Sequence, residues 1–262
     1  MDDNLPMEFG AQLWTHATFL AFVAGAVYAQ ALTGFALALI LLGLVGATNL
    51  VPLPDAVNAT TVLGFCTAWI FLYRRRALRI DRVLVPTLVA SAVGIVVGAL
   101  LLVWLAGTAY QVLRLVLGVS IVACALSLWR AAKPLPSLSS PAVYALTGGI
   151  AGILAGMFSA SGPPLVYLLY RQPMSLARIR ESLMLIFGLG TALRLLIVVP
   201  TGQFSLLSLQ LTAEALPVVL LVTSYAARRA PPLSPRLLRA LVCALLIATG
   251  LSMGIGAVLA MR

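Results

Sequence analysis

Polar side chains that can bind an anion interrupt two long apolar stretches of this 262-residue chain, one in each half. Hydroxyl and amide groups donate hydrogen bonds to oxyanion oxygens, and a glycine lets the backbone approach a ligand closely. In membrane helices the same groups also satisfy backbone groups that a helix break leaves free, and the sequence alone leaves both roles open. These residues are Gln30, Thr33, Gly34, Ser159, Ser161 and Gly162.

Three charged residues lie inside apolar runs, where a charge is functional by default. Arg194 is the candidate anion ligand, because a guanidinium grips an oxyanion bidentately. Arg114 and Arg194 each lie roughly 8–9 Å from the outer edge at 1.5 Å per residue, so snorkelling to the headgroups is the alternative for both. Glu214 lies about 12 Å inside its run. It is expected either to pair structurally with Arg194, which we favour, or to carry a coupling proton.

A third polar group, Asn58, Thr60 and Thr61, begins the apolar run after the first interruption. At such a position the side chains can reach a bound anion, and capping of the helix is the alternative for Asn58. We include all three among the candidate binding residues.

An enzyme is not expected. A serine hydrolase would use Ser161 beside Gly162, but the only histidine, His16, is predicted at the opposite end of the membrane from it. Without a base the hydroxyl is not activated. Cys66, Cys124 and Cys243 are far apart and lie in apolar runs, which indicates buried thiols. We therefore expect no cofactor and no metal.

The composition excludes most soluble proteins. Hydrophobic residues make up 62% of the chain, charged residues 9%, and the mean hydropathy is +1.08, whereas soluble domains are about 45–50% apolar. The net charge of +10 comes largely from arginine clusters between apolar stretches. Such clusters set the orientation of a polytopic membrane protein, so no nucleic-acid partner is expected and the lipid bilayer is the expected surroundings.

Eight apolar runs predict an all-α polytopic membrane protein. The first run contains Gln30, Thr33 and Gly34 at its middle, and the fifth is interrupted by Ser159-Ala160-Ser161-Gly162-Pro163-Pro164. Both runs are therefore predicted to be re-entrant or broken helical hairpins facing protein or a water-filled cavity. The runs are Trp14–Thr48, Ala56–Tyr73, Leu84–Leu105, Thr108–Trp129, Ala142–Tyr170, Ser182–Val199, Leu206–Ala227 and Leu237–Ala260.

The cations decide the expected topology. If the fifth run crosses the membrane, fourteen cations divide equally between the two sides; if it enters and leaves on one side, all fourteen lie together. The positive-inside rule favours the second arrangement and places both termini outside the cytoplasm. The fourteen are Arg74, Arg75, Arg76, Arg79, Arg82, Arg130, Lys133, Arg171, Arg178, Arg180, Arg228, Arg229, Arg236 and Arg239.

Each half then contains one hairpin, which does not cross the membrane, and three helices that do. Because the number of crossings is odd, the second half begins on the opposite side of the membrane, and the halves are expected to be inverted repeats. The predicted units are residues 1–132 and 142–262, joined by a cytoplasmic linker at 133–141. Ala24-Gly25 recurs as Ala151-Gly152, 127 residues later. Inverted repeats with broken helices near the midplane are typical of secondary transporters, and helix N-termini at the breaks suit a small anionic substrate. A passive anion channel built from paired hairpins is the alternative.

Glycines at small-xxx-small spacing occur at Gly94–Gly98 and along Gly148–Gly152–Gly156. This spacing brings helices close together. Packing within the chain is the favoured interpretation, and a homodimer contact is the alternative.

Five segments carry motifs of a known kind: Gly25–Leu42, Leu53–Thr61, Gly148–Pro164, Ala227–Arg239 and Ala248–Ser252. They resemble the TauE/SafE sulfite exporter family over nearly the whole chain. The resemblance implies a multi-pass protein that exports or takes up sulfite, organosulfonates such as sulfoacetate, or related sulfur anions across the bacterial inner membrane. Together with the inverted repeats, it leads us to expect a secondary transporter that works as an exporter.

Overall fold

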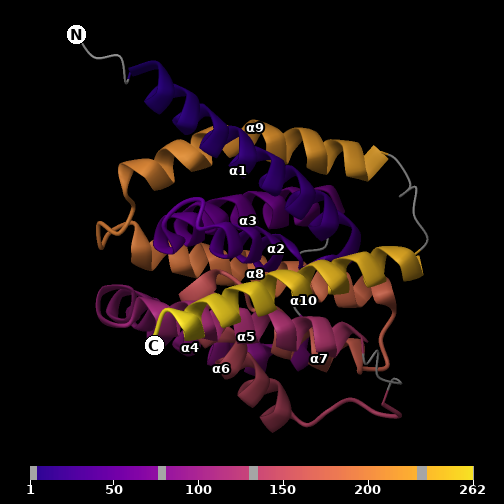
Figure 1. Cartoon of the computed structure of the whole chain (residues 1–262). Coiled ribbons are helices and arrows are strands. Elements are labelled where there is room, and N and C mark those ends of the chain that lie inside the picture. Colours follow the sequence, from indigo (N-terminus) through magenta and orange to yellow (C-terminus); the bar gives the residue numbers. More distant parts are fainter. Residues whose placement is uncertain (1–4, 76–80, 130–134, 229–234, 262) are drawn as a thin grey trace.

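The computed structural model describes residues 5–75, 81–129, 135–228 and 235–261, and its elements are all helical in these ranges (Figure 1). A single turn of 3-10 helix, Arg82–Leu84, precedes α4. The α-helices are α1 Leu5–Thr33, α2 Leu37–Thr48, α3 Leu53–Arg75, α4 Val85–Thr108, α5 Tyr110–Trp129, α6 Pro141–Phe158, α7 Gly162–Tyr170, α8 Leu176–Val198, α9 Leu206–Arg228 and α10 Pro235–Leu259.

Within the described ranges, eight helices are long and apolar enough to cross a membrane. They are α1, α3, α4, α5, α6, α8, α9 and α10, whereas α2 and α7 have only 12 and 9 residues. At about 1.5 Å per residue, neither short helix crosses a hydrocarbon core of about 30 Å. The prediction of an all-α polytopic membrane protein is confirmed.

The first apolar run is interrupted at Thr33-Gly34, and the fifth is interrupted where Ser, Gly and Pro occur together, at residues 159–164. α1 ends at Thr33, and Gly34 then has φ +91°, a left-handed conformation that glycine adopts without a steric penalty. α6 ends at Phe158, followed by Ser159 with φ +55°. After each break the short helix packs against the helix before it, α2 on α1 and α7 on α6.

Three helices begin at least three residues earlier than their apolar runs predict, and one of them is α1, which begins at Leu5 instead of Trp14. α3 begins at Leu53 instead of Ala56, with Pro54 in a first-turn position where a missing N–H costs no helical hydrogen bond. α8 begins at Leu176 instead of Ser182, because Ser175 caps it by accepting a hydrogen bond from the Arg178 N–H at 3.3 Å. Its first turn is exposed, which conceals it from a search for apolar residues.

The helices pack in a paired order around a buried centre. α3 packs on α8 and α5 on α10, while α4 packs on α6 and α9 on α1. α2 contacts α10, and α7 contacts α5. Nearly every residue of α2 from Leu37 to Gly46 is buried. In Figure 1 the beginning of α1 and the end of α10 lie at the same, left-hand end of the bundle.

The glycines of α4 and α6 allow these two helices to touch backbone to backbone. A Cβ added to Gly98 would lie 2.1 Å from the carbonyl oxygen of Ile153, and one added to Gly152 would lie 2.4 Å from that of Ser91. A Cβ on Gly156 would lie 2.2 Å from the Ile95 oxygen. The prediction of packing within the chain is confirmed, and nothing in the described structure supports a dimer through these glycines.

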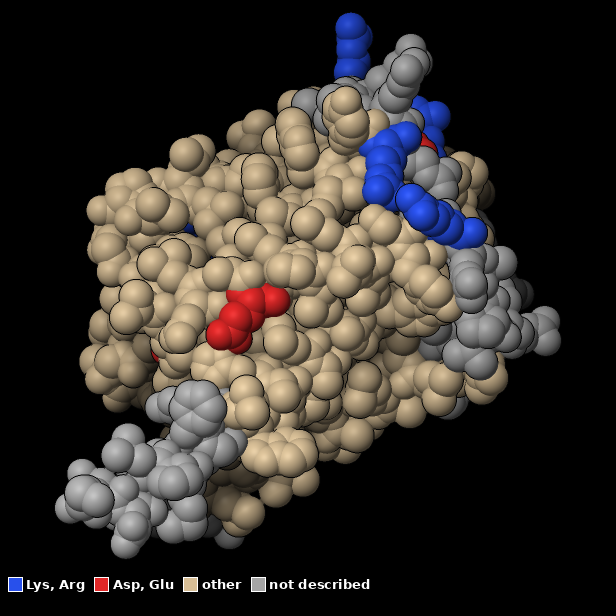
Figure 2. Space-filling model, turned by 90° about the horizontal axis from the view of Figure 1, so that it is seen from above, with Lys and Arg blue, Asp and Glu red and all other residues tan. Residues whose placement is uncertain are grey.

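The charged side chains lie mostly near the helix ends. Figure 2 shows arginine side chains gathered at one end of the face it displays. Arg178 at the start of α8 donates two hydrogen bonds to Asp81, at 2.6 and 2.9 Å, and these hold the pKa of the Asp81 carboxyl below its usual value. Five of the cations used to predict the topology lie outside the described residues: Arg76, Arg79, Arg130, Lys133 and Arg229.

The contact between α4 and α6 can be tested with two alanine substitutions in α6. Gly152→Ala should lower the stability of the protein by about 1–3 kcal/mol, because the new methyl overlaps backbone atoms that cannot move aside. Gly149→Ala is the matched control, since a Cβ there meets nothing within 4 Å. Thermal unfolding in detergent measures both, and equal midpoints for the two variants would contradict the close contact.

Candidate functional site

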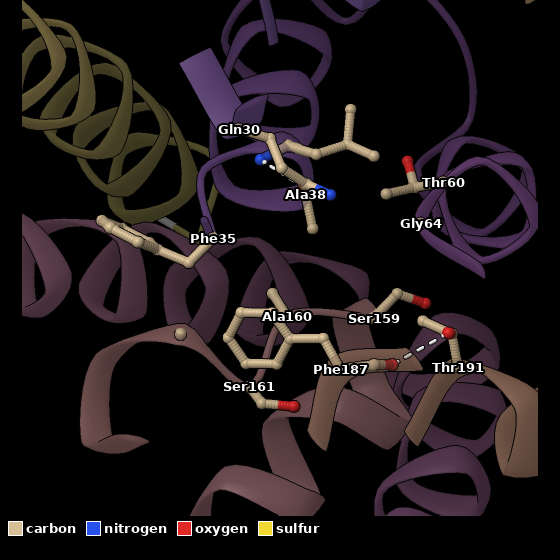
Figure 3. Close-up of a pocket in the computed structure, with 12 residues that line it drawn as sticks. Gln30, Phe35, Ala38, Thr60, Gly64, Ser159, Ala160, Ser161, Phe187 and Thr191 are labelled. Carbon is tan, nitrogen blue, oxygen red and sulfur yellow. Dashed lines mark hydrogen bonds between the residues drawn. The ribbon is translucent and has the colours of Figure 1, made fainter. Parts of the chain in front are cut away.

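A small, partly open cavity lies where the two helix breaks approach each other (Figure 3). The volume that the centre of a water molecule can occupy in this cavity is about 20 Å³. That is enough for a water but too little for a sulfur oxyanion. Figure 3 shows residues around the first break on one side and Ser159, Ala160 and Ser161 on the other. The lining residues are Gln30, Phe35, Leu37, Ala38, Thr60, Gly64, Ser159, Ala160, Ser161, Gly162, Phe187 and Thr191.

The Gln30 side chain connects the two helices on either side of the first break, α1 and α2, and also bonds to α3. Its side chain is 6% exposed, its Nε2 donates to Thr67 Oγ1 at 2.7 Å, and its Oε1 accepts from the Leu37 N–H at 3.1 Å. Leu37 is the first residue of α2, so this side chain at the end of α1 satisfies a backbone donor at the start of the next helix. Gln30 thus performs the backbone role in the present conformation while it also lines the cavity.

Several candidate hydroxyls donate their proton to their own helix. Thr33 bonds to the Ala29 carbonyl, Thr60 to that of Ala56 and Thr61 to that of Val57, at 2.6–2.8 Å. A hydroxyl has one proton to donate, so these groups offer only lone pairs until they rotate. Ser161 differs: it lines the cavity, and no described residue bonds its hydroxyl.

Arg194 lies near the second break and is completely buried. Its guanidinium donates four hydrogen bonds, from Nε to the Gly156 carbonyl at 2.8 Å, from Nη1 to Asn58 Oδ1 and Thr61 Oγ1, and from Nη2 to Asn58 Oδ1. Thr61 is in turn hydrogen-bonded to Ser159, which lines the cavity. All the acceptors are neutral, and among the described residues no carboxylate pairs with Arg194.

The expected pair between Arg194 and Glu214 is wrong. Glu214 Oε2 lies 2.6 Å from His16 Nδ1, because this carboxylate faces α1, whereas Arg194 faces α3 and α6. Arg114 donates to the carbonyl oxygen of Gly46 at 2.9 Å, near the end of α2, where a cation satisfies helix carbonyls. Arg114, Glu214 and Arg194 are all absent from the lining of the cavity, but Arg194 is connected to it through Thr61 and Ser159.

The remaining candidates lie beside the cavity. Gly34 contacts the stem of Arg180, since a Cβ added to the glycine would lie 3.4 Å from Arg180 Cγ. Asn58 is in the second turn of α3, and its side chain bonds to Arg194 and to the Gln203 carbonyl, so the capping alternative for Asn58 is wrong.

Comparison with known proteins identifies the family. The model of the family described as sulfite exporter TauE/SafE matches residues 17–253. The chain is 31% identical over 242 residues to the probable sulfite/organosulfonate exporter TauE of Cupriavidus necator, covering 91% of this chain and 93% of that relative. The chain belongs to the TauE/SafE sulfite exporter family. No solved structure matches it.

Membership in the TauE/SafE family confirms the resemblance seen in the sequence. It makes this chain a membrane transporter and not an enzyme. The expectation that Ser161 is no catalytic nucleophile agrees with the contacts of the single histidine, since His16 is bonded to Glu214 on α9.

Sequence reasoning missed eight residues around the cavity and its network, three of which, Leu37, Ala38 and Ala160, are apolar members of the lining. Phe35 and Phe187 line the cavity from opposite halves of the chain, Gly64 and Thr191 complete its wall, and Thr67 fastens Gln30. Thr67 and Gly64 lie two turns and one turn beyond Thr60, and helical spacing from that residue was the signal that could have found them. Nothing in the sequence distinguished these two phenylalanines from the other apolar residues of their runs.

The contact between α1 and α9 can be tested with a double-mutant cycle on His16→Gln and Glu214→Gln. Each single change leaves a polar partner unpaired, so the double variant should lose less stability than the sum of the two. The expected coupling is about 0.5–3 kcal/mol. Thermal unfolding in detergent at neutral pH measures it, and strictly additive losses would show that the pair contributes nothing.

Proposed function

We propose that the protein is a secondary transporter that exports a small sulfur-containing anion, such as sulfite or an organosulfonate, by alternating access around the cavity between the two helix breaks. The observation that carries this proposal is Arg194, a buried cation whose described acceptors are all neutral. Burying an unpaired charge is costly, so an anion that binds beside it supplies the missing counter-charge. The likeness to an organosulfonate exporter supports sulfur as the central atom of the substrate.

The proposed binding residues fall into two sets around Arg194 and the breaks. Ser161 has a hydroxyl free to donate, and Ser159 and Thr61 connect the cavity to Arg194. Gly162 lets the backbone of the second break approach an anion closely. Gln30 and Thr60 now bond to protein groups and would turn toward the anion as it enters, whereas Asn58 would leave the two Nη groups of Arg194 to the anion. Thr33 and Gly34 shape the first break.

The paired packing of the helices supports an inverted-repeat architecture, with residues 1–132 and 142–262 as the repeats and 133–141 as the linker. Exchanging α1–α5 with α6–α10 converts the contact of α4 with α6 into that of α9 with α1, and the contact of α2 with α10 into that of α7 with α5. The contacts of α3 with α8 and of α5 with α10 convert into themselves. Each short helix would then be the second arm of a re-entrant hairpin.

The size of the cavity supports a carrier more than an open pore. At about 20 Å³ the present space is too small for the substrate. Passage therefore requires the surrounding helices to move, as the two repeats of an alternating-access transporter do in every cycle. A passive anion channel with a closed gate is the alternative, and exchange kinetics separate the two.

Counterflow of labelled sulfite in proteoliposomes tests the proposal. Unlabelled sulfite or sulfoacetate inside should accelerate uptake over empty vesicles, because a carrier returns faster when loaded. Arg194→Gln should reduce this exchange about tenfold or more, since a hydrogen bond from a charged group contributes about 1.5–3 kcal/mol. Arg194→Lys should recover part of it by restoring the charge.

The matched control for Arg194→Gln is Arg114→Gln, which removes an intramembrane arginine away from the cavity and should preserve exchange. Uptake that ignores the internal anion would indicate a channel. Full exchange by Arg194→Gln would remove Arg194 from the site, and no flux with any sulfur anion would overturn the substrate class.

The same proposal places the protein in the bacterial inner membrane with both termini outside the cytoplasm. Reporters fused after Lys133 and after Arg171 should then both report cytoplasm, because the second hairpin enters and leaves on that side. Alkaline phosphatase and a fluorescent protein at each position give opposite readouts and control for expression. Reporters on opposite sides would overturn the inverted-repeat topology.

A further inference from the structure

Asn58 in α3 contacts two separate parts of the protein at once. Its Oδ1 accepts hydrogen bonds from Nη1 and Nη2 of Arg194, both at 3.2 Å, and its Nδ2 donates to the carbonyl oxygen of Gln203 at 2.8 Å. Gln203 lies in residues 199–205, which connect α8 to α9 and which we name the α8–α9 loop. With a side chain that is 3% exposed, Asn58 joins the buried cation directly to this loop.

The other acceptors of Arg194 make no such connection. The Gly156 carbonyl belongs to the backbone of α6, which is held against α4 by direct backbone contact. Thr61 bonds to its own helix and to Ser159. Of the three groups that accept from Arg194, only the Asn58 amide also bonds to the α8–α9 loop.

Asn58 Oδ1 is also the acceptor that an anion would replace most readily. It receives two hydrogen bonds that are each longer than the bond from Arg194 to Gly156, and it is a neutral amide oxygen. An oxyanion offers two charged oxygens to the same two Nη groups, which is the stronger, bidentate arrangement. An amide displaced from the guanidinium also changes the direction of its Nδ2 donor.

We propose that Asn58 couples anion binding at Arg194 to release of the α8–α9 loop. When the substrate binds, the hydrogen bond from Asn58 to this loop breaks and the loop becomes more open to solvent. This inference rests on the proposed function for the identity of the anion. A ligand shifts a conformational equilibrium only if it binds one state better than the other. Here the difference is that Arg194 is free for the anion only when it has left Asn58. By the same linkage, a loop held firmly by Asn58 weakens anion binding.

A second set of hydrogen bonds also holds the α8–α9 loop, and it does not involve Arg194, so it provides a control for Asn58. Ser205 and Ser208 donate to Asp55 Oδ1 at 2.5 and 2.9 Å, which ties the loop and the start of α9 to α3. Neither serine bonds to Arg194. Ser205→Ala should therefore loosen the loop without cutting its connection to the anion site.

The experiment places a fluorophore on the loop at Gln203→Cys, a substitution that keeps the backbone carbonyl bound by Asn58. The thioether is formed before any anion is added, because sulfite itself consumes maleimides. The chain that retains Gln203, treated with the same label, provides the blank for Cys66, Cys124 and Cys243. Acrylamide quenching in proteoliposomes then reports how open the loop is, in sulfite, in sulfoacetate and in chloride at equal ionic strength.

In the otherwise native chain, sulfite or sulfoacetate should raise the quenching constant about twofold over chloride, as the loop population shifts. Asn58→Ala should give the high constant without an anion and no further response. Ser205→Ala should raise the starting value but keep the response. A sulfite-dependent rise in unfolding temperature that persists in Asn58→Ala shows that this variant is folded and still binds the anion.

Two results would overturn the coupling. One is quenching that no sulfur anion changes in the native background, and the other is a full anion response in Asn58→Ala. Counterflow measured in the same vesicles shows which proposal has failed. Anion exchange without a loop response would contradict only the role of Asn58. Absence of both exchange and loop response would contradict the proposed transport as well.

Discussion

The hydrocarbon region of a membrane offers no hydrogen-bond partner to a broken helix, and this constraint determines where the two breaks can lie. Both are enclosed by protein. At the first, the Gln30 side chain bonds to the Leu37 N–H at the start of α2. At the second, the N–H of Ser159 bonds back to Ala155 at 2.8 Å, and its hydroxyl bonds to Thr61. Each break also has a partner on α3, Thr67 for Gln30 and Thr61 for Ser159, so both breaks lie in the same buried region, where a cavity with polar and apolar lining residues lies between them.

Close helix packing positions the charge beside that cavity. α6 approaches α4 so closely that only glycine fits at Gly152 and Gly156, and the same stretch of backbone presents the Gly156 carbonyl to Arg194. A guanidinium held from its Nε side by a fixed carbonyl keeps its two Nη groups directed toward α3, where they meet Asn58 and Thr61. The glycines therefore determine both the stability of the bundle and the direction in which its buried cation points.

The sequence predicted the helices and their breaks better than the contacts that side chains make between helices. Long apolar runs identify spanning helices because hydrocarbon thickness sets their length, and Gly34 and Pro163 mark the breaks through backbone chemistry. The polar residues at the breaks were found for the same reason, and Gln30, Ser159 and Ser161 do line one cavity. Which face of a helix a charge occupies depends on packing between distant segments. Arg194 and Glu214 lie on helices that follow each other in the chain, yet they bond to different helices. The sequence does not indicate which helix each of these side chains faces.

The two breaks differ in a way that explains why the cation belongs to one of them. α2 begins with Leu37, Ala38 and Leu39, all of which have an N–H group, although that of Leu37 is bonded to Gln30. α7 begins with Gly162 and then two prolines, which have no N–H, so half of the four free donors of a helix start are missing there. The second break therefore offers an anion less positive charge from its backbone. Arg194, connected to that break through Thr61 and Ser159, places a full charge where the helix start is weakest.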